Sequence, residues 1–496
     1  MNEPGATVSG TPATGPATGP ATGPASRVEL NGTNVIAEHE RKGRPRDLFW
    51  PWTAASISVF GISYGSFALS YGISWWQAVL ATVVGVLGSG VLAGVIAVAG
   101  KRGSAPTMVL SRAAFGVNGN KVPAAVSWLL TVGWETVLTT LAALATATVL
   151  REVGWGGGDA TRLAALAFVV VLIIAGGVLG FDAIMRIQTA ITYVGIALTL
   201  VYVALVAHHI DLGAVTALPG GGPSAVVGAV ILMATATGLG WVNAAADYSR
   251  YLPRRASGAG VAGWTATGLS AAPLLLIGFG VLLAGSDPRL DDAIGSDPIG
   301  ALASILPTWF LLPFAVVAVL GLVAGAILDI YSSGLSLLAL GLPASRPVAA
   351  LVDGLIMLLG SVYVLFVADE FFNQFQGFLI TLGVPIAAWA GVMLADVALR
   401  RRDYDEPALF DPTGRYGAVR GPVLALFLAA TVLGWGLVTN TYASWLHWQG
   451  YLMGPLGGKD GPWAFASLGV LVALVLGFVG YLLLGRRAVA AQERGR

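Results

Sequence analysis

Two acidic residues lie inside long apolar runs, where an ionised side chain is hard to accommodate. Glu135 is part of GWETV (residues 133–137), and Asp329 is part of AILDIYSSG (residues 326–334). A charged side chain at the centre of a bilayer costs on the order of 3 kcal/mol or more, and neither residue has a Lys or Arg in its own run. Each carboxyl is therefore paired across segments, protonated or exposed to water. We expect both to have a functional role, Asp329 more than Glu135; the alternative is a carboxyl that only hydrogen-bonds neighbouring helices.

Two tryptophans accompany these deep positions. Trp134 precedes Glu135, and Trp241 lies in a second segment that is rich in small residues. Two aromatic faces close together make a slot for a flat heteroaromatic ring, with stacking worth roughly 1 to 3 kcal/mol per base. The alternative is that each ring fills an ordinary gap between helices. Their places beside a deep carboxyl and a glycine-rich segment favour the slot.

Two segments combine glycines with small hydroxyl residues, SISVFGISYG (56–65) and TATGLGWVN (235–243). Gly weakens a helix by about 1 kcal/mol relative to Ala, so clustered Gly predicts that each helix unwinds and exposes its backbone there. The alternative is close helix packing, which we expect of Gly90 and Gly94. Together with Trp134, Glu135 and Asp329, the candidate binding residues are Ser56, Gly238, Gly240, Trp241 and Asn243.

The composition indicates which kind of secondary structure holds these residues in place. Only 11% of the 496 residues are charged and 56% are hydrophobic, against roughly 25% charged in soluble domains. The mean hydropathy of +0.78 comes from apolar runs long enough to cross the bilayer as helices of about 20 residues. Strands of a β-barrel would alternate in polarity, and these runs do not. The sequence thus predicts an all-α integral membrane protein.

Apolar runs between charged or Gly/Pro-rich breaks predict twelve transmembrane helices. The two glycine-rich segments lie five helices apart, as expected for two five-helix repeats of opposite topology whose broken helices hold a solute and an ion near the midplane. The predicted helices lie near residues 48–72, 75–99, 122–150, 163–181, 187–208, 225–250, 264–284, 309–340, 347–367, 371–398, 419–440 and 463–485.

The distribution of Lys and Arg predicts the orientation. With both termini in the cytoplasm, all but four of the 27 basic residues fall on the inner side, as the positive-inside rule requires. The exceptions are Arg151, Arg162, Arg289 and Lys459. The expected organisation is a disordered tail (1–45), a core (46–398) with inverted repeats near 48–208 and 225–398, two further helices (419–485) and a C-terminal tail (486–496).

Several chemistries find no support in the sequence. Cysteine is absent, which excludes disulfides and thiol nucleophiles. The histidines have no metal-ligand spacing, and no nucleophile–base constellation indicates an enzyme. Isolated polar residues do not form the continuous stripe of a channel. We expect no resident cofactor or metal and no nucleic-acid partner, only a small solute, a co-transported H⁺ or Na⁺ and the lipid bilayer.

Several motifs resemble the nucleobase-cation symporter family, in its purine-cytosine permease branch, over residues of about 27 to 440. The motifs are VELNGTNVIAEHERKGRPRDLFWPW, APTMVLSRAAFGVNGNKVPA, GWETV, AADYSRYLP, LDIYSSGLSL and PIAAWAGVMLADVALRRRDY. The family is similar in fold to LeuT-type transporters, which implies two inverted five-helix repeats and two extra C-terminal helices. The resemblance implies that Trp134 stacks on one face of a base, Trp241 covers the other, Asp329 hydrogen-bonds the substrate or couples protons, and the first helix contributes around Ser56.

The chain departs from the family pattern at two places. Relatives often carry Gln one turn from the tryptophan of the third helix, where this chain has Thr131 and Leu138. Sodium-coupled members place hydroxyls on the eighth helix beside the cation, and residues 319–326 (VLGLVAGA) contain none. Backbone carbonyls alone make a poor sodium cage, because hard cations want several oxygens. We therefore expect a proton, carried by Asp329 or Glu135.

The expected function is import of a planar nucleobase or related heterocycle of the cytosine/purine class across the cytoplasmic membrane, by cation symport. A hydantoin, allantoin or a pyridine vitamin suits the same slot, and a passive facilitator or channel is the alternative mechanism. Arg112 and the pair Asp247 and Arg250 lie at cytoplasmic helix ends, where we expect them to orient the ends and hold inner gates by surface-type ion pairs rather than touch the substrate.

Overall fold

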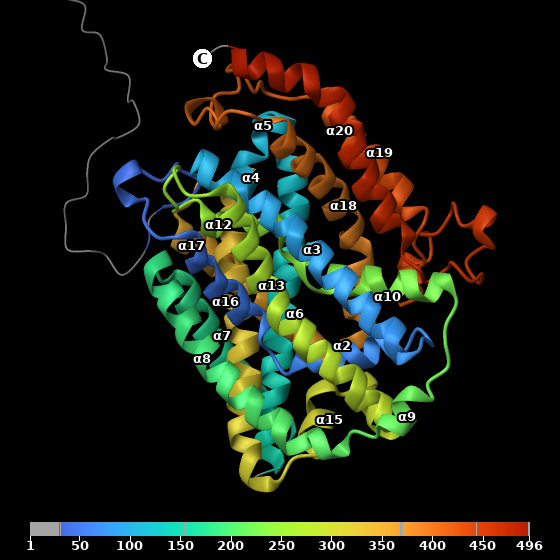
Figure 1. Ribbon diagram of the computed structural model, residues 1–496. Coiled ribbons are helices and arrows are strands. Elements are labelled where there is room, and N and C mark those ends of the chain that lie inside the picture. The colour runs from blue at the N-terminus through green and yellow to red at the C-terminus, as the bar shows by residue number, and fades with distance from the viewer. Residues whose placement is uncertain (1–28, 30, 153, 368–370, 443, 495–496) are drawn as a thin grey trace, which may run out of the picture.

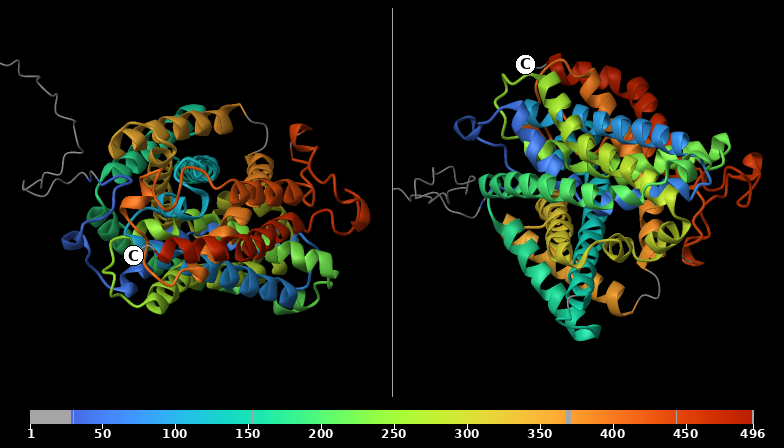
Figure 2. Two further views of the ribbon diagram at one scale, coloured as in Figure 1. Left: turned by 90° about the horizontal axis from the view of Figure 1, so that it is seen from above. Right: turned by 60° about the horizontal axis from the view of Figure 1, so that its bottom comes forward.

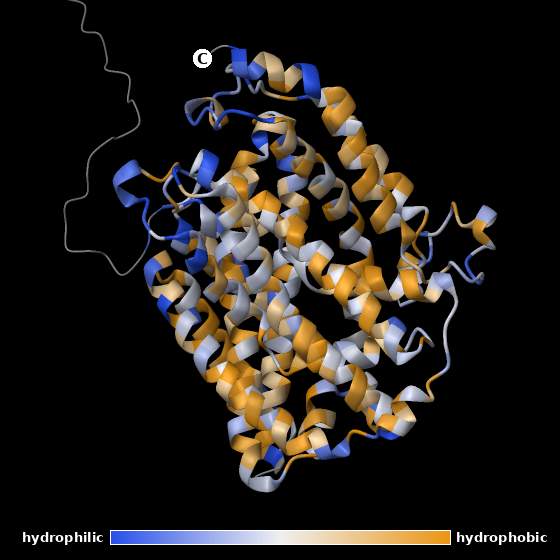
Figure 3. Cartoon of the chain, viewed as in Figure 1, coloured by the Kyte–Doolittle hydropathy of each residue, from blue (hydrophilic) through white to orange (hydrophobic). Residues whose placement is uncertain are grey.

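The computed structural model describes residues 29, 31–152, 154–367, 371–442 and 444–494, and within them every regular element is a helix (Figure 1). Among these residues, ten helical segments are long and apolar enough to cross a membrane. Hydrophobic residues follow the long helices, and hydrophilic residues gather at their ends (Figure 3). The uninterrupted long helices are α3 (Trp75–Gly103), α6 (Lys121–Glu152), α7 (Gly158–Val178), α8 (Phe181–Val206), α13 (Gly258–Ser286), α16 (Leu311–Leu340), α17 (Arg346–Phe366), α18 (Phe371–Leu399) and α20 (Leu468–Arg494).

The remaining spans are interrupted or short. The first predicted span consists of α1 (Phe49–Ser56) and α2 (Phe60–Leu69). The sixth consists of α10 (Pro223–Ala236), α11 (Gly238–Trp241), η4 (Val242–Ala244) and α12 (Ala245–Ser249). The eleventh is the short helix α19 (Gly421–Trp435). Each predicted helix therefore has a counterpart, which is consistent with a count of twelve. The connections carry α4 (Thr107–Leu110), α5 (Arg112–Phe115), α9 (Leu212–Thr216), α14 (Pro288–Ser296), α15 (Pro298–Ser304) and short 3₁₀ turns, among them η1 (Glu38–Glu40) and η2 (Pro45–Leu48).

The two halves of the core pack through equivalent helices. The second helix of each half, α3 and α13, lie side by side, as do the third helices, α6 and α16 (Figures 1 and 2). Gly90 and Gly94 make the first contact close, because a Cβ on either would lie 2.4 Å from Ser270 Oγ or Ala262 O, respectively. The packing role expected of these two glycines is confirmed.

The break in the first span falls between α1 and α2, where Ile57 leaves the helical conformation with φ −89° and ψ 75°. Gly61 and Gly65 come after this break, inside α2. A Cβ on Gly65 would lie 2.2 Å from the carbonyl carbon of Gly280 on α13. The helix is broken as predicted, but its glycines serve close packing of α2 on α13 and do not form the unwound point.

The sixth span breaks at Thr237, whose backbone has φ −120° and ψ −114°. Its hydroxyl donates to Met233 O at 2.6 Å, which satisfies a carbonyl released by the break. Gly238 lies against α3, since its Cβ would be 2.4 Å from the carbonyl carbon of Ser89. This break therefore lies within the predicted glycine-rich segment, one residue before its first glycine.

Gly280 provides a test of this packing. A Cβ there would lie 1.9 Å from Ile62 O, a backbone atom that cannot move aside. We expect Gly280→Val to lower stability by about 3 kcal/mol or more, because overpacking against backbone costs at least the upper part of the usual range. The thermal midpoint of the detergent-purified protein measures the loss. Gly278→Ala is the matched control, because nothing lies within 4 Å of its Cβ; an equal loss in both variants would contradict the packing account.

The described part of the predicted disordered tail is ordered. Residues 1–28 and 30 lie outside the described residues. Beyond them, Ile36 is fully buried and its N–H donates to Ser104 O at 2.8 Å, while Lys42 N–H donates to Tyr251 O at 2.8 Å. The expected boundary of the tail at residue 45 is therefore wrong, because partners far away in the sequence satisfy this segment's backbone.

Candidate functional site

A cavity lies where the breaks of the first and sixth spans face each other. Its wall comes from α1, α2, α6, α10, α11, α13 and α16, which bring together residues from both halves of the core. Aromatic rings and small residues dominate the wall, with few polar groups, as is usual for small-molecule sites. The lining residues are Ala55, Ser56, Ser58, Phe60, Gly61, Tyr64, Trp134, Leu138, Ala236, Thr237, Gly240, Trp241, Pro273, Gly321, Leu322 and Asp329.

Both predicted tryptophans line this cavity. Trp134 projects from α6, and a Cβ on Gly240 would lie 3.5 Å from its Nε1, so the α11 backbone passes close to the indole. Trp241 ends α11 and meets the edge of Trp52, with ring centroids 5.5 Å apart at 70°. Trp52 is itself held edge-on by Tyr248, at 5.1 Å. One ring therefore stands on an intact helix and the other on a four-residue helix within the broken span.

Asp329 supplies the acidic group of the cavity. It lies on α16 with 2% of its surface exposed, and its Oδ2 has no hydrogen-bond partner among the described residues. One residue before it, the Leu328 carbonyl accepts from the Tyr248 hydroxyl at 2.8 Å. A buried acceptor without a donor costs about 1 to 3 kcal/mol, so a ligand N–H or a proton at Asp329 would relieve it.

Three predicted site residues do not line the cavity. Gly238 is pressed against α3, as described above. Asn243 is buried and its Nδ2 donates to Ser127 Oγ at 2.9 Å. Glu135 is fully buried on another side of α6, and neither carboxylate oxygen has a hydrogen bond within the described residues. Ser56, Gly240, Trp134, Trp241 and Asp329 are the predicted residues that the structure brings together.

Glu135 has two acidic neighbours, Asp329 and Asp353, together with the hydroxyl of Ser333. Asp353 lies on α17, is fully buried, and accepts from Trp128 Nε1 at 2.8 Å and from Ser333 Oγ at 2.9 Å. Sequence reasoning missed Asp353. The signal was present, since RPVAALVDGLIMLLG also places an acidic residue in an apolar run, but its position seven residues after Arg346 suggests a helix end.

Other wall residues were also missed. Ser58 and Thr237 are hydroxyls at the two breaks, and Tyr64 and Pro273 complete the wall from α2 and α13. Ser58 and Tyr64 lie within the predicted segment 56–65, so their residue types could have indicated them. Pro273, inside a long helix, removes a backbone donor and could have been identified by that property.

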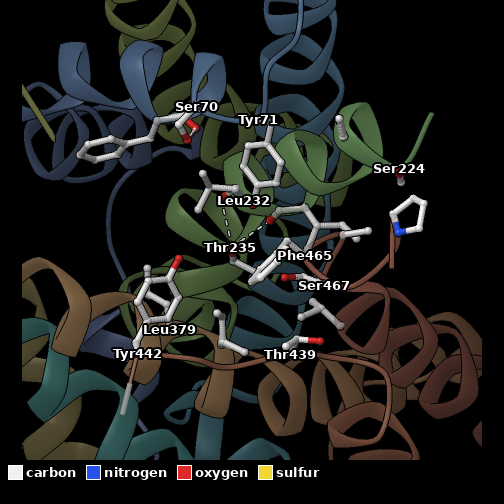
Figure 4. Close-up of a pocket in the computed structure, with 17 residues that line it drawn as sticks. Ser70, Tyr71, Ser224, Leu232, Thr235, Leu379, Thr439, Tyr442, Phe465 and Ser467 are labelled. Atoms are coloured by element: carbon white, nitrogen blue, oxygen red, sulfur yellow. Dashed lines mark hydrogen bonds between the residues drawn. The ribbon is translucent and has the colours of Figure 1, made fainter. Parts of the chain in front are cut away.

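A second, larger cavity of about 370 Å³ adjoins the first. Thr235 lines this outer cavity and the next residue, Ala236, lines the central one. Rings of Tyr71, Tyr442 and Phe465 and several hydroxyls face the space in Figure 4, and none of its lining residues is charged. The outer cavity lies between the broken spans, α18 and the segment that joins α19 to α20. Its neutral, aromatic wall suits an uncharged flat solute.

At the opposite end, ion pairs close the bundle. Arg250 is fully buried and pairs with Glu29, Nη2 to Oε1 at 3.4 Å, and donates to the Tyr331 hydroxyl at 2.8 Å. Asp247 accepts instead from Thr107, N to Oδ1 at 2.7 Å. The expected surface-type pair of Asp247 and Arg250 is therefore wrong, because each residue has its own buried partner.

Arg112 is buried as well. Its guanidinium donates to the carbonyls of Leu409 and Ala339, each at 3.2 Å. Burial lowers the pKa of Arg112 to about 10, so the group stays charged at neutral pH and ties α5 to the end of α16. Arg112 thus joins helix ends through backbone carbonyls and does not touch the cavity.

Two broken spans that enclose a central cavity define a membrane transporter of the inverted-repeat class. Residues 35–449 match the family model of permeases for cytosine/purines, uracil, thiamine and allantoin, and the chain belongs to this family. It is similar to a putative purine-cytosine permease, YxlA, of Bacillus subtilis (strain 168), with 24% identity over 464 residues that cover 91% of this chain and 96% of the relative.

Solved structures agree on the fold. Mhp1, a nucleobase-cation-symport-1 family transporter, in a closed conformation with bromovinylhydantoin bound, superposes with a TM-score of 0.68 at 19% identity, covering 93% of this chain and 98% of Mhp1. Its inward-facing conformation gives 0.66 at 18% identity, covering 95% and 98%. The predicted LeuT-type architecture of an all-α membrane protein is confirmed.

Proposed function

We propose that this protein imports a planar nucleobase or related heterocycle of the cytosine/purine class by proton symport. The observation that carries the proposal is the cavity in which Trp134, Trp241 and Asp329 meet at the two helix breaks. Family membership and the heterocycle bound by Mhp1 support the class of substrate. The segment around residues 31–48, the 400–416 connection and the end of α20 lie at one end of the molecule (Figure 1), and the Lys and Arg bias assigns that end to the cytoplasm.

In this mechanism the base reaches the central cavity through the outer one. One ring face stacks on Trp134 and the other on Trp241, while Ser56, Thr237 and Asp329 satisfy polar atoms on the edge of the base. Trp241 belongs to the broken span, so closing the cavity over the base couples binding to movement of α10 and α11. Solute and proton are coupled because each binds the same conformation better.

The contact of the first span with α16 favours a proton over sodium. Two glycines of α16 approach carbonyls of the first span: a Cβ on Gly321 would lie 2.7 Å from Ile57 O, and one on Gly325 would lie 3.7 Å from Ala55 O. Neither brings a side-chain oxygen. The nearby Ala324 carbonyl already accepts from Gln188 Nε2 at 2.9 Å. At these contacts α16 therefore adds no side-chain oxygen to the several that a sodium ion requires.

A panel uptake assay tests the proposed function. Purified protein in liposomes is given radiolabelled cytosine, adenine, hypoxanthine, a hydantoin, allantoin and a pyridine vitamin, with an acidic exterior or an inward sodium gradient. We expect one nucleobase to accumulate more than tenfold with the pH gradient, and sodium to add nothing. Accumulation only with sodium would refute the proton, and equilibration without accumulation under either gradient would indicate a facilitator.

A further inference from the structure

A buried polar chain leads away from the central cavity through the interface of α6, α16 and α17. Asp329 faces the cavity, and Ser333 lies one turn further along the same face of α16. Ser333 Oγ donates to Asp353 Oδ2 at 2.9 Å, and Asp353 Oδ1 accepts from Trp128 Nε1 at 2.8 Å. Glu135 has Ser333, Asp353 and Asp329 as neighbours, so several groups that can exchange a proton gather at this interface.

Glu135 is the residue that distinguishes these polar side chains from an ordinary group of acidic residues. It is fully buried, and both of its oxygens lack a hydrogen-bond partner among the described residues. Its charged neighbours are Asp353 and Asp329, both acidic. Leaving a carboxylate in that position unpaired is costly, whereas a proton bound there removes the charge. The site is therefore built to hold a proton.

Within the part of the protein that the structure describes, basic residues do not neutralise this group of polar side chains. Arg346 begins α17 but donates to the carbonyls of Gly177, Val178 and Leu179. The other described titratable side chains on the elements that contact α6, α16 or α17 lie near helix ends or have partners elsewhere: Lys121, Arg151, Asp159, Arg162, Asp182, Arg186, Tyr193, Tyr202, Tyr331, Tyr363 and Asp396.

Asp353 extends the chain toward the end that carries Arg346. It lies seven residues after Arg346, about 10 Å along a helix at 1.5 Å per residue. Glu135 is fourteen residues from Lys121, which begins α6 at the same end, so it lies about 10 Å deeper. A proton that passes from Glu135 to Asp353 has moved toward the side that we assign to the cytoplasm.

We propose that Glu135, Ser333 and Asp353 form a proton relay that releases the coupled proton to the cytoplasm along α6, α16 and α17, separately from the path of the solute. The Glu135 carboxyl gives its proton to Ser333 Oγ while the Ser333 hydroxyl gives its own proton to Asp353. Glu135 ends as a carboxylate, Asp353 as a carboxylic acid, and Ser333 is unchanged. Trp128 is a positioning residue, because its N–H fixes the orientation of Asp353.

The relay rests on the proposed proton symport and is tested in liposomes loaded with a pH-sensitive dye. Solute-driven proton entry and exchange of labelled base across the membrane are measured on the same preparation. Asn imitates a permanently protonated carboxyl, so Asp353→Asn is expected to keep exchange within about twofold of wild type and to lose more than 90% of solute-driven proton entry. Ser333→Ala is expected to slow proton entry about tenfold, and Asp353→Glu to restore part of it.

Asp292→Asn, an exposed carboxyl on α14, is the matched control and should change neither readout. Trp128→Phe removes only the N–H donor and should shift the pH dependence of proton entry while exchange persists, so it keeps the test informative if Asp353→Asn does not fold. Wild-type proton entry in both Asp353→Asn and Ser333→Ala would overturn the relay alone. Absence of solute-driven proton entry in the wild type would overturn proton symport, and the relay with it.

Discussion

Replacing Trp134 with alanine is expected to raise the dissociation constant for the transported base by about 5- to 150-fold, because one stacked face is worth roughly 1 to 3 kcal/mol. The indole is 8% exposed and packs in the hydrophobic core, but it also borders a cavity that already exists, so its removal mainly enlarges the site. The protein should therefore still fold and reach the membrane. Binding of labelled base to purified protein gives the constant directly.

Two further variants sharpen this test. Trp134→Phe keeps a smaller aromatic face and should lose less affinity than Trp134→Ala. Trp309→Ala removes an indole that is 65% exposed and does not line the cavity, and it should leave binding unchanged. Wild-type affinity in Trp134→Ala would show that the base does not occupy the slot between the two tryptophans.

Asp329→Asn is expected to abolish accumulation of the base against its gradient and also to weaken binding by about 10-fold or more. The carboxyl lines the cavity with a free buried acceptor, and hydrogen bonds to charged groups contribute about 1.5 to 3 kcal/mol. Uptake under an acidic exterior and equilibrium binding report the two effects separately.

Glu135→Gln is the matched comparison, because Glu135 is equally buried but does not line the cavity. We expect this variant to lose accumulation while its dissociation constant stays close to that of wild type. If Asp329→Asn retained both full accumulation and full affinity, Asp329 would have neither of the two roles proposed for it.

The glycine-rich segments show that local sequence can predict where a helix breaks but not what its glycines contact. Both helices break inside or beside the predicted windows, because small and hydroxyl residues there stabilise a helix poorly. The glycines themselves mostly allow close helix packing: Gly65 packs against Gly280, and Gly238 packs against Ser89. The absence of a Cβ has two consequences: it weakens the helix, and it lets another helix approach closely. Which consequence matters at a given glycine depends on the helix that packs against it.

Trp134 and Glu135 show the same limit for the site. Both are deep in one apolar run, and the sequence therefore predicts function for both. Consecutive residues on a helix point about 100° apart, so Trp134 faces the cavity while Glu135 faces the α17 side, near Asp353. Depth in the membrane can be read from an apolar run, but the direction of a side chain depends on which helices surround it.

The sequence by itself determined that the protein lies in a membrane, where its spans are, which two helices are interrupted and which family it resembles. Each of these follows from hydropathy, charge placement or motifs within one segment. Tertiary structure decided which deep polar residues share the cavity, that Glu29 reaches the buried Arg250, and that Asp353 joins Glu135. These arrangements join residues on different helices, and the packing of two halves against each other fixes them through contacts that no single segment contains.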